Sequence, residues 1–204
     1  MELRNLIDPH LDLARLSKVL DELGTPARVW ATRHWTRDIQ AKLWEAVKGF
    51  RPVTLDDYVP PGVAPHVQVI THGMNSLPAF NHFQKRFAKP ADPGAKDQLV
   101  GYNYQSNAVF TGPGYYVAHP AADAGEVDID YTMLPKEKAE AWPPIVDNSA
   151  RLGRFVYYGM VDVMRGISSH VSIGRARKKQ GWMDAWFVLV REDPQPAEPP
   201  PAAS

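Results

Sequence analysis

The stretch Glu126-Val127-Asp128-Ile129-Asp130-Tyr131-Thr132-Met133 alternates between polar and apolar residues at every position. Successive side chains of a β-strand point to opposite faces of the sheet, so this period of two predicts a strand with one buried and one solvated face. The segment therefore places a β-sheet in the second half of the chain.

Further strands are expected around this segment, because β-branched and aromatic residues gather there between turn signals. They cover residues 67–71, 100–110, 115–119, 154–164, 170–175 and 185–191. The segment 154–164 is apolar on both faces, which predicts a strand covered on both sides. Strands joined by turns from residue 99 onward indicate an antiparallel sheet.

Helical spacing of apolar residues dominates the first part of the chain. We expect one helix over residues 9–23 with Asp8 as its N-cap, and a second from Thr36 to about Gly49. A third is expected from Ser76 to the residue before Pro90, because Phe80, Phe83 and Phe87 follow each other at three- and four-residue spacing. The predicted fold class is α+β, with amino-terminal helices followed by a curved antiparallel sheet.

The composition predicts one domain in the cytoplasm. A chain of 204 residues suits a single core over residues 1–193, and five prolines make residues 194–204 a disordered tail. There is no cysteine, which excludes thiol chemistry and disulfides. The amino terminus lacks the apolar run of a signal peptide, and no stretch is long and apolar enough to span a membrane. The oligomeric state stays open.

Nucleic-acid binding is not expected, because 23 basic residues balance 23 acidic residues. A basic run could contact phosphate while Trp182 stacks on a base, but a solvated hairpin turn explains this run more simply. Its members are Arg175, Arg177, Lys178 and Lys179. The sequence also lacks a Walker loop, a dinucleotide fingerprint, an HExxH pair and a nucleophile elbow.

No metal or cofactor is expected. Three histidines, at positions 66, 72 and 82, have side chains that zinc or iron could use. Positions at a loop edge and on a helix surface explain them more simply. Glu126, Asp128 and Asp130 share one strand face, where they could split their pKa values or pair with Arg175 or Arg177 on a neighbouring strand.

Tyrosine is concentrated in the β half, and its apolar ring with a polar tip suits the wall of a ligand cavity. We therefore predict binding of a small hydrophobic or aromatic molecule, although ordinary packing in the core and at its rim explains the same tyrosines equally well. The expected ligand contacts are Tyr102, Tyr104, Tyr131, Trp142 and Asp147, with Trp142 as a lid over the open end of the sheet. The simpler alternative is that Trp142 plugs the bottom of the core and Asp147 caps a turn. The alternative is a cofactor-independent acid–base enzyme of the isomerase, cyclase or dehydratase type, with His119 and Tyr131 as candidate catalytic residues.

The succession of the strand segments beginning at Glu126, Arg154 and Ala185 resembles that of lipocalin-like barrel proteins, over residues 99–193. The resemblance implies a cup-shaped sheet that holds a lipid-like or aromatic molecule. The helices-first order is also similar to that of cystatin-like proteins, in which a cone-shaped sheet wraps around amino-terminal helices.

Overall fold

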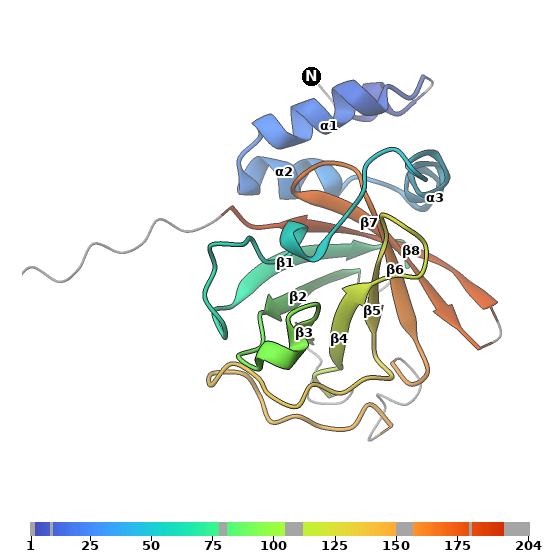
Figure 1. Cartoon of the computed structure of the whole chain (residues 1–204). Helices are drawn as coiled ribbons and strands as arrows, with labels where there is room; N and C mark the ends of the chain where they lie inside the picture. Colours follow the sequence, from blue (N-terminus) through green and yellow to red (C-terminus); the bar gives the residue numbers. More distant parts are fainter. Residues whose placement is uncertain are drawn as a thin grey trace, which may run out of the picture.

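The computed structural model describes residues 3–8, 10–77, 81–104, 112–149, 157–179 and 181–193. Within these residues, eight antiparallel strands follow each other around a closed barrel (Figure 1). They are β1 (Val69–Asn75), β2 (His82–Ala88), β3 (Leu99–Tyr104), β4 (Tyr115–Pro120), β5 (Val127–Asp130), β6 (Val161–Gly166), β7 (Val171–Lys178) and β8 (Gly181–Arg191). The barrel closes because β1 pairs with β8 as well as with β2.

This architecture confirms the predicted α+β class with a lipocalin-like barrel. The cystatin-like alternative is wrong, because pairing of the first and last strands leaves no open cone. Inward-facing residues of all strands form one core, which includes Phe87, Ile129 and Leu189. Closure also removes the free sheet edges that would otherwise offer unpaired backbone groups.

The helices lie together on one side of the barrel, over β7 and β8 (Figure 1). They are α1 (Leu13–Glu22), α2 (Thr25–Thr32) and α3 (Arg37–Ala46), preceded by a short 3-10 turn (Leu3–Leu6). Leu16, Leu20 and Leu43 are fully buried in a second core. This core also contains outward-facing residues of β7 and β8, so the helices cover one wall of the barrel from outside.

The helix predictions need two corrections in this region. The N-cap of α1 is Asp12, whose carboxylate accepts a hydrogen bond from the backbone N–H of Arg15 at 3.0 Å, and not Asp8. The sequence predicted one helix that ends at residue 23 and no second helix directly after it, so α2 was missed. Gly24 is the N-cap of α2, and Pro26 lies in its first turn.

The helix expected from Ser76 to Pro90 is wrong, because residues 82–88 form strand β2. Phe83 and Phe87 are four residues apart, a spacing that fits one face of a helix and equally one face of a strand. In the strand, both rings point into the barrel together with Lys85, and the expected N-cap Ser76 accepts a hydrogen bond from the backbone N–H of Trp186 at 2.9 Å. Phe80 lies outside the described residues.

Other strand predictions were right in kind and inexact in extent. Residues 157–159 form a turn, so the strand expected over 154–164 begins only at Val161, and residues 150–156 lie outside the described part of the chain. The strand expected over 100–110 is described to Tyr104. Strands β7 and β8 are longer than expected, since each continues into the hairpin that joins them.

The two ends of the barrel differ. We call the end that carries the β2–β3, β4–β5 and β6–β7 connections the base, and the opposite end the mouth. The segment before β1 closes the base: Val53, Tyr58 and Val59 are buried inside the barrel. Tyr58 packs on Phe87 with ring centroids 4.9 Å apart, and its hydroxyl donates to Ser172 at 3.1 Å. A cavity of about 10 Å³ beside Tyr58 and Ser172 has about the room of one water molecule, so the space beside this plug inside the barrel is too small for a ligand.

A buried arginine ties the helices to the end of the last strand. Arg28 of α2 is 1% exposed, and its guanidinium contacts the Asp193 carboxylate at 3.1 Å and the Leu20 carbonyl at 2.9 Å. Partial burial acts to raise the pKa of Asp193, but hydrogen bonds from Thr25 and Arg28 outweigh it and hold that pKa below its ordinary value.

Because the pKa of Asp193 is lowered in the fold, we expect the stability of the protein to fall in acid. Because its pKa is lower in the folded chain than in the unfolded chain, Asp193 stabilises the fold above the unfolded pKa of about 4, and the contribution is lost as the pH falls through the folded value. Urea unfolding of the wild type should show this loss between about pH 5 and pH 2. The Asp193→Asn variant should be less stable at neutral pH and should lose less stability on acidification; equal losses in both proteins would contradict the assignment.

Candidate functional site

Four polar side chains meet inside the mouth half of the barrel. Lys85 comes from β2, Asn103 from β3, Asp162 from β6, and Tyr131 from the turn directly after β5. Each is at most 4% exposed. We call these residues the Lys85 cluster. The rest of the barrel interior consists mainly of apolar and aromatic side chains.

The Lys85 ammonium is satisfied by three partners. It lies 2.9 Å from the Asp162 carboxylate and donates to the Asn103 side-chain carbonyl at 3.1 Å and to the Tyr131 hydroxyl. The Asn103 amide donates to the Tyr131 oxygen at 2.9 Å, and the Tyr131 hydroxyl lies 3.3 Å from Asp162. All three N–H donors of the ammonium are therefore used, which is what a buried lysine requires.

Aromatic rings surround this ammonium. Its nitrogen lies 4.8 Å from the ring centroid of Tyr131, 5.0 Å from that of Tyr116, 5.5 Å from that of Phe187 and 5.7 Å from that of Phe83. A cation within about 6 Å of an aromatic centroid is attracted by the ring quadrupole. The Lys85 ammonium is therefore stabilised by its ion pair with Asp162 and by four surrounding aromatic rings.

Glycines make room for these rings. Inward-facing Gly73, Gly101 and Gly174 lie under the rings of Phe83, Tyr116 and Phe187, and a Cβ atom at any of the three would overlap the ring. At Gly101 a movement of the Tyr116 ring would not make room for a side chain, because the added Cβ would also lie 2.6 Å from the backbone carbonyl oxygen of Arg86. Glycine is therefore needed at these three positions for the aromatic rings to pack around Lys85.

The electrostatics of the cluster follow from its burial. Desolvation lowers the pKa of Lys85 below its ordinary value, while the charge and hydrogen bond of Asp162 oppose the shift. Desolvation raises the pKa of Tyr131 well above its ordinary value, and the negative charge of Asp162 adds to the effect. Tyr131 is consequently a neutral hydroxyl at physiological pH, able to donate one hydrogen bond and to accept others.

No protein-family model matches this chain, and no curated protein matches its sequence. Its function is therefore inferred from geometry.

The sequence analysis found Tyr131 but missed Lys85, Asn103 and Asp162. Lys85 was assigned to a helix, where a lysine between two phenylalanines points to solvent. In a strand the alternation Phe83-Lys85-Phe87 puts the lysine on the apolar face, and a charged residue on such a face signals a buried site. That signal was present in the sequence once the period was assigned correctly.

The other expected ligand contacts lie outside the barrel interior. Tyr102 and Trp142 pack together on the outer wall formed by β3 and β4, with ring centroids 5.0 Å apart. Tyr104 is 49% exposed on the outer surface. Asp147 is exposed and accepts a hydrogen bond from the backbone N–H of Ser149 at 2.7 Å, as expected for an ordered turn.

The two expected catalytic residues are not brought together. His119 lies on the outer face of β4, where it pairs across the strands with Asp128 of β5 and has its Nε2 atom 3.9 Å from Asp130. Tyr131 lies inside the barrel. One substrate molecule cannot contact both side chains in this arrangement.

Trp142 is a structural residue of the outer wall in this geometry. It is 4% exposed, and its indole N–H donates to the Gln68 side chain at 2.8 Å. We expect Trp142→Ala to lower the free energy of unfolding by about 3–5 kcal/mol, the usual cost of removing a buried aromatic ring. Urea unfolding and ligand titration should be run together. A large loss of affinity with unchanged stability would instead favour a lid.

The carboxylate row and the histidines have local partners. Asp128 pairs with the expected Arg177 at 2.7 Å, although Arg177 is on β7 and reaches past the intervening β6, and Glu126 contacts Arg165 at 2.6 Å. His66 contacts Glu137 and His72 contacts Glu192, each at 2.7 Å. Within the described residues, no three histidine or acidic side chains gather as a metal site.

The basic run lies on the hairpin of β7 and β8, as the alternative reading of these residues proposed. The guanidinium of Arg175 lies 5.5 Å from the ring centroid of Trp182, and Arg177 is engaged by Asp128. A search of the helices in the described ranges found none that is both long and apolar enough to cross a bilayer.

Proposed function

We propose that the barrel binds a small, mainly apolar or aromatic molecule that carries one polar group, in the mouth half beside the Lys85 cluster. The observation that supports this proposal is the set of four buried polar side chains enclosed by aromatic rings. Ligand sites are typically lined by apolar and aromatic surface with a few fixed polar groups, and the Lys85 cluster matches that description.

The cost of burial supports a role beyond stability. Removing a lysine and an aspartate from water costs several kcal/mol per ion, and apolar residues of similar volume often replace such a pair without loss of stability. The perturbed pKa values of Lys85 and Tyr131 also fit the pattern of functional sites. A ligand hydroxyl or carbonyl could exchange hydrogen bonds with Tyr131, Asn103 or Asp162.

The mouth is the route of entry in this proposal, since Tyr58 and its neighbours fill the base. The Tyr157 ring stacks on Tyr131 with centroids 5.2 Å apart and planes 17° apart. A ligand ring would take this place when Tyr157 moves outward. Of the five ligand contacts expected from the sequence, the proposal retains Tyr131.

An acid–base enzyme is the second candidate, and the position of the Tyr131 hydroxyl between Lys85 and Asp162 favours it. Its raised pKa keeps Tyr131 protonated, so its hydroxyl would stabilise negative charge that develops on a bound substrate by donating a hydrogen bond. A Tyr131→Phe variant that keeps ligand affinity and loses turnover would separate this candidate from simple binding. His119 has no part in this mechanism. A single domain with a separate tail, a cytoplasmic location and the absence of nucleic acid stay predictions.

Co-purification tests the binding proposal directly. Mass spectrometry of the protein purified under native conditions and then denatured should show release of a small hydrophobic molecule. A Gly174→Val variant, in which the new side chain displaces the Phe187 ring beside Lys85, should release less of it per mole of folded protein. Equal release from a variant that remains folded would place the molecule elsewhere.

A further inference from the structure

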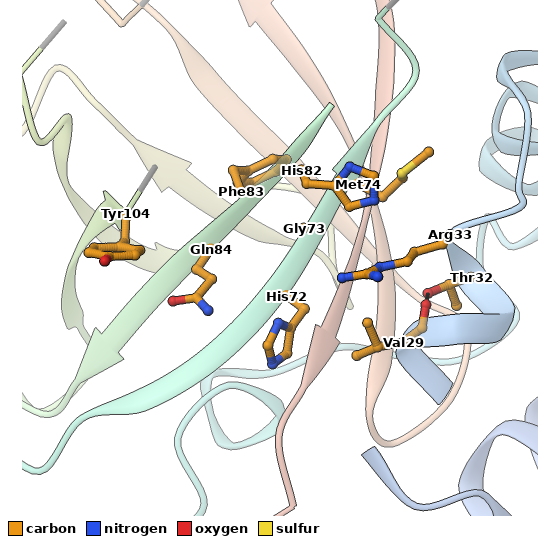
Figure 2. A pocket seen from close by; sticks show the side chains of 10 residues that line it. All are labelled: Val29, Thr32, Arg33, His72, Gly73, Met74, His82, Phe83, Gln84 and Tyr104. Atoms are coloured by element: carbon orange, nitrogen blue, oxygen red, sulfur yellow. Dashed lines mark hydrogen bonds between the residues drawn. The ribbon is translucent and has the colours of Figure 1, made fainter. Parts of the chain in front are cut away.

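A groove of about 210 Å³ lies on the outer surface of the barrel, between α2 and the strands β1 and β2 (Figure 2). Val29 of α2 and Met74 of β1 contribute apolar surface, and Tyr104 borders the opposite side. Figure 2 shows the Arg33 side chain extending from the end of α2 toward β1, beside His72 and Met74. No member of the Lys85 cluster lines the groove, but Phe83, whose ring lies beside Lys85 inside the barrel, borders both.

Positive charge prevails around this groove. The Arg33 side chain is exposed, and among the described residues its guanidinium has no hydrogen-bond or ion-pair partner. The Arg86 guanidinium lies 3.9 Å from the ring centroid of Tyr104 and donates to the Gln84 side chain at 3.0 Å. The Glu192 carboxylate lies near the groove and contacts His72, one of the groove residues, at 2.7 Å.

The remaining titratable group of the groove is His82, at the start of β2. Its Nδ1 atom lies 2.9 Å from the Asn81 side-chain oxygen, and its ring is exposed. It adds no negative charge in either protonation state. An anion in the groove would therefore meet the Arg33 guanidinium and two imidazoles, while the nearby Glu192 carboxylate already has a partner and the Arg86 guanidinium lies just beyond the lining, behind Gln84 and Tyr104.

We propose that this groove binds a small aromatic carboxylate, with Arg33 as its charged anchor. A guanidinium offers a planar fork of N–H donors that matches a carboxylate in a bidentate geometry. Val29, Met74 and the partly exposed Tyr104 ring supply apolar contact for a flat ring. The volume of about 210 Å³ lies below the roughly 300–1,000 Å³ of sites for drug-sized ligands, so the ligand is of single-ring size.

Benzoate is the probe, with acetate and benzyl alcohol as matched controls that lack the ring and the charge. Each is titrated into the full-length ¹⁵N-labelled protein and followed by amide chemical shifts. We expect benzoate to bind about tenfold more tightly than either control, because each control loses one class of contact. The shifts should centre on residues 29–33, 72–74 and 82–84.

Variants at exposed positions test the anchor without disturbing the core. Arg33→Gln should weaken benzoate binding about tenfold, Arg33→Lys should weaken it less, and Lys96→Gln should leave it unchanged. Lys96 is a suitable control because it is exposed in the connection between β2 and β3, outside the groove. The proposal is overturned by absent binding, by equal affinity for Arg33→Gln, by equal affinity for benzyl alcohol, or by shifts that map elsewhere. None of these results bears on ligand binding inside the barrel.

Discussion

Replacing Asp162 with alanine should lower the free energy of unfolding by about 3–5 kcal/mol, because it leaves a fully buried ammonium without its anion. The Asp162 carboxylate lies 2.9 Å from the Lys85 nitrogen, and both side chains are nearly inaccessible. The loss should be smaller at about pH 10 than at about pH 7. Removing Asp162 lowers the pKa of Lys85 further, so the lysine in the folded variant becomes neutral more readily.

The matched control replaces both charges. Lys85→Met combined with Asp162→Leu removes the ion pair and keeps apolar volume, so its stability should lie within about 1–2 kcal/mol of the wild type. Urea unfolding of the two single variants, the double variant and the wild type gives the coupling free energy. A double variant as unstable as the sum of the single variants would show that the pair does not behave as a unit.

Tyr58→Ala should be similarly costly, with a loss of about 3–5 kcal/mol, because the ring closes the base of the barrel. The side chain is almost completely buried and packs on Phe87, which belongs to the inner core. Removing it opens a cavity between the barrel and the segment that precedes β1. The measurement is again urea unfolding.

Tyr58→Phe is the control for this prediction. It keeps the ring and removes only the hydroxyl that donates to Ser172, so we expect a loss of about 1 kcal/mol. If Tyr58→Ala were no worse than Tyr58→Phe, the segment would not act as a plug, and entry of a ligand from the base would have to be considered.

The fold could be predicted where one periodicity stood alone. The alternation in Glu126–Met133 has no helical interpretation, and its first part corresponds to β5 with Val127 and Ile129 facing the interior. The strand ends at Asp130, Asp128 on the expected solvated face is buried, and Met133 is exposed. Phe83 and Phe87 satisfied two periodicities at once, so β2 was assigned as a helix. Closure of the barrel depends on the pairing of β1 with β8, which joins segments more than 100 residues apart. No local pattern encodes that contact.

The candidate site was harder to predict from the sequence than the fold, because its four residues come from separate segments of the chain. Tyr131 was found through its place on the apolar face of the strand expected over Glu126–Met133. Asp162 lies in the segment 154–164, which was interpreted as apolar on both faces. Asn103 lies between Tyr102 and Tyr104, and these two tyrosines, which point to the opposite face of the strand, were predicted as the ligand contacts instead. The register of β2 against β3 pairs Lys85 with Asn103, and closure of the barrel brings Asp162 of β6 to Lys85 across the interior.

The central claim is that the Lys85 cluster anchors the polar group of a ligand inside the barrel. The most direct test is fluorescence titration with naphthol and with naphthalene, which differ by one hydroxyl. We expect the wild type to bind naphthol about tenfold more tightly than naphthalene, and the Lys85→Met/Asp162→Leu variant to bind both equally. An Arg33→Gln variant should behave like the wild type. A preference for naphthol that persists in the double variant, or no preference in the wild type, would contradict the claim.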